Sequence, residues 1–313
     1  MNHGTSGERK SYAVRVFEEH RGLLVSVAYR VLGSVTDAED AVQEAWLRWS
    51  GVEHSEIADP RAFLVRVTTR LAIDRLRRVK ARRESYVGPW LPEPILTGRD
   101  LSEDAAMAES VSMAMLVVLE TLSPLERAVF VLREAFGMPH AEIAEVLGRK
   151  EEAIRQLARR ARAHVRERRT RFDADEEEQR RVTERFLEAT AGGDLEGLMG
   201  VLAPGVTLVA DGGGKALSPR RPVRGAEKVA RFLVTVVGEE QTSRFLRSVG
   251  SGPSGEVRAR LAPVNGETGV VVTAGGVPVS ALVLEVTEGL VRTIRLVANP
   301  EKLAGLRGIE TPR

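Results

Sequence analysis

Cysteine is absent from this 313-residue sequence. That absence excludes disulfide bonds, zinc–thiolate sites and a cysteine nucleophile. Long apolar runs are also missing: none approaches the roughly 20 residues that cross a bilayer, and the N-terminal MNHGTSGERKSYAVRVFEEH lacks the apolar core of a signal peptide. We therefore expect a soluble, cytoplasmic protein that is long enough for two or three domains.

The chain has little excess charge of either sign, because its net charge is only +2. Its basic and acidic residues are nevertheless unevenly distributed along the sequence. Residues 66–83 hold eight Arg or Lys and one acid, and residues 149–171 hold ten Arg or Lys and three acids. Either block alone is more typical of a solvated helix face. Two such blocks on one chain favour a polyanion that is bound in two places.

The segment TDAEDAVQEAWLRW, residues 36–49, predicts an amphipathic helix. Its start reads as a capping box, with Thr36 as the N-cap and Glu39 three residues later. One face repeats small apolar residues at helical spacing, namely Ala38, Ala41, Val42 and Ala45. The opposite face suits a basic or polar protein partner and carries Asp37, Asp40, Gln43 and Glu44.

A polar loop at 51–59 leads to a second helix, predicted over about 61–82. Its inward stripe would consist of Leu64, Val67 and Leu71, and a basic face would carry Arg66, Arg70 and Arg77. Three aromatic residues lie near the junction of the two helices: Trp46, Trp49 and Phe63. Aromatic rings beside a basic helix can stack on unpaired bases, although such rings, Trp46 included, are more often core residues.

Residues 122–165 predict a helix-turn-helix. Ser123, Pro124 and Glu126 form a capping box for a helix that ends at Gly137. A short helix at 140–147, a turn at Gly148 and a long helix from about 151 follow. The long helix has an apolar face with Ile154, Leu157, Ala158, Ala161 and Val165, and a basic face with Arg155, Arg159, Arg162 and Arg166. A purely structural amphipathic helix is the weaker alternative.

DAEDAVQEAWLRW, AFLVRVTTRLAIDRLRR and residues 122–162 resemble regions 2 and 4 of the extracytoplasmic-function (ECF) sigma factors of the sigma-70 family, over roughly residues 10–170. The resemblance implies that region 2 docks on the β′ clamp of core RNA polymerase and opens the −10 promoter element. It implies that region 4 binds the β flap and reads the −35 element. It assigns polymerase binding to the acidic face named above, and capture of a flipped base to Gly51–Asp59.

The same resemblance assigns the DNA contacts. The −10 helix would use Arg66, Arg70, Arg77 and Arg78, and the −35 helix would use Arg155, Gln156, Arg159 and Arg160. Thr69-Arg70 stands where many members of the family have Arg-Asn.

A linker is predicted over 84–111, between region 2 (10–83) and region 4 (112–170). The prolines in and beside WLPEP exclude a helix there, so Trp90 and Leu91 should lie on an extended segment that seeks a pocket. The acids that follow resemble a sigma linker that threads a polymerase channel: Asp100, Glu103, Asp104 and Glu109.

A third domain is predicted over 176–298, after the acidic stretch DADEEE. Helices are expected at about 177–191, 194–202 and 226–237, and strands at 206–211, 244–249, 257–264, 268–273, 279–287 and 290–297. Helices followed by a curled antiparallel sheet indicate an α+β fold, and the order resembles the SnoaL-like cone-shaped barrel of polyketide cyclases, isomerases and small-molecule binders. The expected fold class is thus multidomain, with two all-α sigma domains followed by an α+β SnoaL-like domain.

The loop DGGGK, residues 211–215, suggests either a phosphate cradle or a catalytic loop. A phosphate loop needs Ser or Thr after the lysine, but Ala216 follows Lys215. From residue 170 onward there is no His, Tyr, Trp or Cys, so acid–base catalysis would rest on Asp211 or a glutamate. Three successive glycines permit another segment to approach closely, which favours a docking loop over a catalytic one.

The chain resembles the ECF factors that carry a SnoaL-like extension, a group marked by a WLPEP-type linker motif, a DGGGK loop and an NPDKL-type tail. Here the motifs are Trp90, Leu91, Pro92, Glu93 and Pro94, then Asp211, Gly212, Gly213, Gly214 and Lys215, and then, in the 299–313 tail, Asn299, Pro300, Glu301, Lys302 and Leu303. The resemblance implies regulation of the sigma core by the fused domain without a separate anti-sigma factor. We hypothesise that the three motifs pack against one another.

The sequence therefore predicts a DNA-binding transcription initiation factor rather than an enzyme, with no catalytic residue, cofactor or metal. The alternative is a bifunctional sigma factor whose barrel binds or converts a small metabolite. A ligand retained by the purified barrel domain would distinguish the two.

Overall fold

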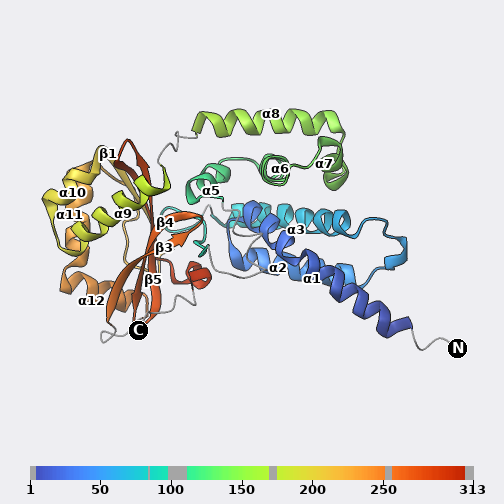
Figure 1. Ribbon diagram of the computed structural model, residues 1–313, viewed down its shortest axis with the longest axis horizontal. Coiled ribbons are helices and arrows are strands. Elements are labelled where there is room, and N and C mark those ends of the chain that lie inside the picture. Colours follow the sequence, from blue (N-terminus) through green and yellow to red (C-terminus); the bar gives the residue numbers. More distant parts are fainter. Residues whose placement is uncertain (1–4, 84, 98–110, 169–174, 251–255, 307–313) are drawn as a thin grey trace. The chain divides into compact units, whose positions relative to one another are not determined.

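The computed structural model describes residues 5–83, 85–97, 111–168, 175–250 and 256–306, and these residues form two compact units (Figure 1). The first, helical unit comprises residues 5–82 and 115–168. The second, α+β unit comprises the described residues from 175 onward together with 85–97 and 112–114. Most of the described part of the predicted linker therefore belongs to the C-terminal unit. None of the described helices is long and apolar enough to cross a membrane.

The helical unit begins with three long helices. They are α1 (Thr5–Leu32), α2 (Val35–Ser50) and α3 (Pro60–Arg83), with a short 3₁₀ turn η1 (His54–Glu56) before α3. The predicted N-cap of α2 was wrong by two residues. Gly33 has a φ of 71° after the end of α1, Ser34 is extended, and the Ser34 hydroxyl accepts the Asp37 N–H at 3.1 Å. Ser34, not Thr36, is therefore the N-cap.

The predicted apolar stripe of α2 is confirmed, since its four alanine and valine residues are at most 3% exposed. Trp49 is fully buried and donates its indole N–H to the Ala13 carbonyl at 2.9 Å, so it is a core residue. Trp46 is half-buried, with its ring edge-on to Phe17 at 5.1 Å between centroids. On α3 the predicted stripe is buried at Leu64 and Leu71 and half-buried at Val67.

A second group of helices follows in the same unit. It comprises α5 (Met113–Glu120), whose first two residues belong to the C-terminal unit, then α6 (Pro124–Phe130), a π-helical turn η2 (Val131–Ala135), α7 (His140–Leu147) and α8 (Glu151–Arg168). The capping box of Ser123 and Glu126 is confirmed, as is the turn at Gly148, which is left-handed with a φ of 61°. The helix predicted to run to Gly137 is regular only to Phe130, because its last turn widens into the π-helical form.

The C-terminal unit contains one six-stranded sheet with helices before and within it. Its elements are α9 (Glu176–Ala191), α10 (Leu195–Val201), β1 (Leu202–Asp211), β2 (Val223–Arg224), α11 (Ala226–Val237), α12 (Glu239–Ser248), β3 (Val257–Val264), β4 (Glu267–Ala274), β5 (Val277–Thr287), β6 (Leu290–Val297), and the 3₁₀ turns η3 (Pro300–Lys302) and η4 (Ala304–Leu306). The strand order is β2-β1-β6-β5-β4-β3. The predicted α+β class is confirmed.

Two details of that prediction were wrong. The segment 244–249 lies in helix α12 and its end rather than in a strand, because Phe245 and Leu246 pack as a helical pair against Ala274 and Val279. The sheet is mixed rather than antiparallel, since β1 runs parallel to β6. A parallel pair between strands more than 80 residues apart is decided by tertiary packing and has no local sequence signal.

The sheet is buried on both faces. Helices α9, α10 and α11 lie on one side of it (Figure 1), against aliphatic strand residues such as Leu208, Leu284 and Ile294. Strand alternation turns the next residues to the second face, where Val271, Ala281, Val283 and Val297 are at most 2% exposed. Asp211 alternates with Ala210 of the helix-covered core and so belongs to the second face.

Candidate functional site

Asp211 ends β1 with a fully buried side chain. Its Oδ1 accepts the Tyr86 hydroxyl at 2.6 Å and the Gly213 N–H at 3.1 Å. Its Oδ2 accepts the Leu91 N–H at 2.8 Å and the Lys302 ammonium at 2.7 Å. A buried carboxylate needs both a counter-charge and hydrogen-bond donors, and Asp211 has four donors, one from its own loop and three from two distant segments. The carboxylate is thus saturated by structural contacts.

Lys302, from the NPEKL motif, supplies the counter-charge. Its side chain is 8% exposed, and its Nζ also donates to the Leu91 carbonyl at 2.6 Å. The ammonium lies 3.9 Å from the centroid of the Trp90 ring and 5.0 Å from that of Tyr86. A desolvated ammonium above two aromatic faces gains cation–π attraction in addition to the ion pair. The WLPEP backbone, its tryptophan and the tail therefore share one cation.

Tyr86 connects the same carboxylate to Asn299. Asn299 donates its Nδ2 to the Tyr86 oxygen at 2.9 Å, and its Oδ1 accepts the Glu301 N–H at 3.1 Å at the start of η3. Burial, together with the hydrogen bond and negative charge of Asp211, raises the pKa of Tyr86 well above its usual value. The hydroxyl therefore stays protonated and remains a donor to Asp211.

The glycines of DGGGK permit these close approaches. Gly213 has a φ of 59°, and a Cβ there would lie 2.3 Å from the Nδ2 of Asn299. Gly214 has a φ of 73°, and a Cβ there would lie 3.1 Å from the Cβ of Val87. A Cβ on Gly212 would meet the Ser218 hydroxyl. A side chain at Gly213 or Gly214 is disfavoured by both backbone conformation and space, and one at Gly212 by space alone.

The remaining motif residues lie around this centre. Lys215 forms an exposed ion pair with Glu301, so the DGGGK loop and the tail also meet at the surface. Leu91 and Leu303 are 2% and 3% exposed. Pro92, Glu93 and Pro94 are buried as well. The structure therefore brings all three motifs together, as the packing hypothesis requires.

The stretch that contains WLPEP continues from its contact with Asp211 to the far edge of the sheet. Ile95 donates its N–H to the Asn265 side chain at 3.2 Å and accepts the Asn265 N–H at 2.9 Å. The Thr97 N–H bonds to the Pro263 carbonyl at 2.9 Å, and its hydroxyl accepts the Gly266 N–H at 2.9 Å. Residues 91–97 therefore run from the end of β1 to the β3–β4 turn and are fixed at both ends.

Two of these contact residues were missed in the sequence. Tyr86 lies four residues before Trp90, and only its aromatic character beside a proline-rich segment could have drawn attention to it. Asn265 adopts a φ of 52° in an Asn-Gly turn, which is a recognisable hairpin signal, but the side-chain bond to Ile95 is not encoded locally. The acids predicted for the linker, Asp100, Glu103, Asp104 and Glu109, lie outside the described residues.

The acidic face predicted on α2 is accessible. Asp40, Gln43 and Glu44 are exposed, and Asp37 is half-buried. Arg75 of α3 bridges Asp37 and Asp40 at 2.6 Å each, and Glu44 pairs with Arg48 at 2.7 Å. The surface therefore presents a polar array in which three of the four side chains are paired with arginines.

The basic residues of α3 do not form one uniform surface. Arg77 and Arg78 are exposed, and Arg66 lies over the Phe63 ring at 5.4 Å. Arg70 instead donates its Nε to the Val146 carbonyl at 2.8 Å, in the last turn of α7. A groove of about 780 Å³ lies between the 52–66 stretch and α7, whose Glu142 and Glu145 face it. The loop predicted to capture a base is thus opposite acidic side chains.

Further contacts join the two helical groups within this unit. Lys80 of α3 donates to the Leu122 carbonyl at 2.5 Å and to the Glu120 carbonyl at 3.2 Å. The fully buried Arg127 of α6 donates its Nε to the Arg30 carbonyl at 3.0 Å and also pairs with Glu120. The first group of helices (α1–α3) is therefore hydrogen-bonded to the second (α5–α8) through the half-buried Lys80 and the buried Arg127.

Helix α8 carries the predicted recognition residues, and all four are exposed: Arg155, Gln156, Arg159 and Arg160. Its predicted apolar face is confirmed, with Ile154, Ala158, Ala161 and Val165 buried. Arg155 pairs with Glu151 at 2.6 Å one turn earlier, and Arg160 lies 3.7 Å from Glu126. Surface pairs of this kind exchange readily for other anions.

Comparisons with known proteins agree with this arrangement. Residues 16–83 match the family Sigma-70 region 2, and residues 112–165 match Sigma-70, region 4. The chain is 42% identical over 296 residues to the ECF RNA polymerase sigma factor SigJ of Mycobacterium tuberculosis, covering 93% of each chain. It is 33% identical over 291 residues to the probable ECF RNA polymerase sigma factor SigI of the same organism, covering 92% of this chain and 93% of SigI.

A crystal structure of Mycobacterium tuberculosis SigJ is also similar, with a TM-score of 0.71 and 40% identity over 93% of this chain and 98% of that chain. The similarity to SigJ extends over both units. Sigma factors bind core RNA polymerase and promoter DNA, and they are not enzymes. From its helix-turn-helix, its two matched regions and its similarity to SigJ over nearly its whole length, the chain belongs to the ECF RNA polymerase sigma factors and initiates transcription.

Proposed function

We propose that this sigma factor is regulated in cis by its C-terminal unit, which fixes residues 85–97 through the Asp211 carboxylate. The observation that carries the proposal is that one buried carboxylate accepts both the Leu91 N–H and the Lys302 ammonium. Removing any partner leaves a buried charge or donor uncompensated. The three motifs therefore associate or separate as a group, which is the behaviour expected of a two-state contact.

The position of the fixed segment explains how it would act. Residues 85–97 follow region 2, residues 112–114 are the first residues of region 4, and both stretches belong to the C-terminal unit. The −10 and −35 elements are about 25 base pairs apart, or roughly 85 Å of B-form DNA at 3.4 Å per pair. Regions 2 and 4, which are hydrogen-bonded through Arg70 and Lys80, must separate to read both elements. We infer that the fixed segment restrains that separation.

The contacts with polymerase and promoter follow from the exposed surfaces. The acidic face of α2 would dock on the β′ clamp, and region 4 would also contact the β flap. The exposed arginines of α8 would read the −35 element, and the α3 arginines would contact the −10 element once Arg70 leaves α7. Control by a fused domain makes a separate anti-sigma factor unnecessary, because a tethered partner is present at high effective concentration.

In vitro transcription tests the proposal. A target promoter is first mapped after overproduction of the chain. Core polymerase is then supplied with the wild type, with Asp211→Ala, or with a chain truncated after Ala298. Both variants should raise promoter-specific transcript several-fold from an unchanged start site. Glu227→Ala is the matched control, because it removes an exposed carboxylate paired with Arg231 on α11. Wild-type transcript levels from both variants would overturn the proposal.

A further inference from the structure

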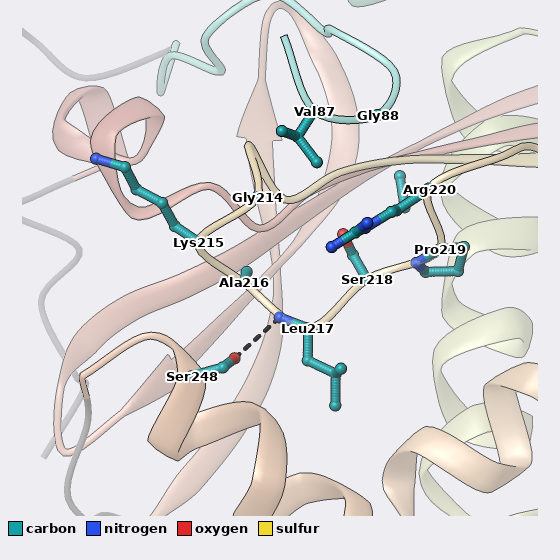
Figure 2. A pocket seen from close by; sticks show the side chains of 11 residues that line it. Val87, Gly88, Gly214, Lys215, Ala216, Leu217, Ser218, Pro219, Arg220 and Ser248 are labelled. Atoms are coloured by element: carbon teal, nitrogen blue, oxygen red, sulfur yellow. Dashed lines mark hydrogen bonds between the residues drawn. The ribbon is translucent and has the colours of Figure 1, made fainter.

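A cavity of about 250 Å³ lies beside the DGGGK loop and takes no part in the Asp211 contact. Its walls come from Val87 and Gly88, from residues 214–220, and from Ser248 at the end of α12 (Figure 2), together with Ala210 of β1. All of these residues belong to the C-terminal unit. Because both the segment before WLPEP and the DGGGK loop line the cavity, an occupant would touch the two together.

Several side chains in the cavity wall are apolar and remain partly uncovered. Val87 is 43% exposed and Leu217 is 51% exposed, and Pro219 and Ala216 complete the same wall. Ser248 is already engaged, since its hydroxyl accepts the Leu217 N–H at 2.9 Å and donates to the Phe245 carbonyl at 2.6 Å. Apolar side chains that remain exposed around a concavity are typical of a binding site for an apolar group.

Arg220 supplies a positive charge to this cavity. Figure 2 shows its side chain extended between Val87 and Ser218, whereas Lys215 points away, in keeping with its pair with Glu301. Among the described residues, Arg220 makes no ion pair or side-chain hydrogen bond. A guanidinium presents a planar fork of donors that matches a carboxylate.

We propose that this cavity binds a small organic anion, with its carboxylate on Arg220 and a short apolar chain against Val87, Leu217 and Pro219. The volume equals that of about eight water molecules at roughly 30 Å³ each, which suits a monocarboxylate with a chain of about six carbons. The site lies where β1 passes into the DGGGK loop, next to Ala210 of the helix-covered core.

Binding there would stabilise the state in which the motifs are in contact, since Val87 and Gly214 must be close together to form the site. This consequence rests on the proposed cis regulation. The binding site itself does not, because binding is measured without polymerase or DNA.

Ligand-observed NMR and calorimetry on the full chain test the site, with hexanoate as the probe and 1-hexanol and inorganic phosphate as the comparison ligands. Arg220→Gln removes the inward cation, and Arg221→Gln is the matched control, because Arg221 is also exposed but does not line the cavity. Hexanoate should bind saturably and more tightly than either comparison ligand. Arg220→Gln should weaken it about tenfold or more, as expected for a lost hydrogen bond to a charged group, and Arg221→Gln should leave it unchanged.

Four results would overturn the assignment. They are no saturable binding of hexanoate, equal binding by Arg220→Gln, equal affinity for 1-hexanol, and tighter binding of phosphate than of hexanoate. Melting temperatures of both variants establish that they are folded. The effect of hexanoate on transcription is read separately. If the chain binds hexanoate but gives the same transcript level with and without it, the binding site stands and its proposed effect on regulation is overturned.

Discussion

Helix α8 and the Asp211 centre use charged side chains in opposite ways. On α8 the charges stay in water, with Arg155 and Arg160 each 65% exposed, and their pairs are each worth about 0.3–0.5 kcal/mol or less. At the Asp211 centre the two partners are 0% and 8% exposed. Breaking a buried pair by removing one partner costs about 3–5 kcal/mol. The charges of α8 therefore remain available to DNA, whereas those of the centre are committed to joining three segments.

The largest expected effect comes from removing the buried carboxylate. Asp211→Ala removes the carboxylate that compensates the buried Lys302 ammonium. We expect the free energy of unfolding of the C-terminal unit to fall by about 3–5 kcal/mol, measured by urea titration. Glu227→Ala, which breaks an exposed pair, should change it by no more than about 0.5 kcal/mol. Similar losses in the two variants would contradict the contrast between buried and exposed charge.

A second buried carboxyl group, that of Glu267, tests the contrast between buried and exposed charge through the pH dependence of stability. On the second face of the sheet, Arg295 pairs with Glu285 at 2.7 Å, whereas the buried Oε2 of Glu267 has no hydrogen-bond partner among the described residues. Burial raises the pKa of Glu267 to about 7, with the negative charge of Glu285 adding to the rise and Arg295 and the Met113 N–H opposing it.

The folded state therefore binds a proton that the unfolded chain releases near its ordinary pKa of 4.5. Stability should fall as the pH rises from about 4.5 to 7, by up to about 3 kcal/mol, and this contribution is fully present only below that window. The test compares urea unfolding of the wild type and Glu267→Gln across that pH range. The difference between the two should change along this slope, and a constant difference would contradict the assignment.

Substitutions on the exposed face of α8 should have the smallest effect on stability. They should weaken DNA binding instead. Arg159→Ala should weaken binding to the −35 element by about 1–3 kcal/mol if the side chain reads a base edge. Its unfolding free energy should stay within about 0.5 kcal/mol of the wild type, because the side chain is exposed. Footprinting and urea titration of the same preparation measure both quantities. Undiminished protection of the −35 element by Arg159→Ala would contradict the assignment of Arg159 to the recognition surface.

Much of the fold could be predicted because its signals are local. The bounds of α7, α11, β3 and β6 coincide with those expected from periodicity and turn residues, and Gly148 forms the predicted turn. The failures have physical causes. Helix α12 contains an adjacent Phe-Leu pair that reads as a strand unless its packing partners are known, and the parallel pairing of β1 with β6 depends on contacts distant in sequence.

The candidate site was predictable only as a grouping of motifs. Their co-occurrence suggested that they meet, but the decisive donor is the Leu91 backbone N–H, and every residue except proline has one. Tyr86 lies outside all three motifs and still donates to Asp211. The engagement of Arg70 by α7 was equally hidden, since an arginine on a basic helix gives no sign that a carbonyl will bind it.

The most direct test of the central claim fixes the contact covalently. A Cβ on Gly214 would lie 3.1 Å from that of Val87, within a few tenths of an ångström of the roughly 3.5–4.5 Å of a disulfide. The φ of 73° at Gly214 strains a cysteine there, but this strain is common to the oxidised and the reduced protein. Because the chain has no cysteine, Val87→Cys combined with Gly214→Cys introduces the only possible disulfide.

Transcription is then compared between the oxidised and reduced forms of this one protein, with the cysteine-free wild type under both conditions as the control. Mass spectrometry verifies the bond. If the contact restrains the separation of regions 2 and 4, the oxidised form should transcribe several-fold less than the reduced form. Equal transcription by the two forms, with the bond verified, would contradict the account.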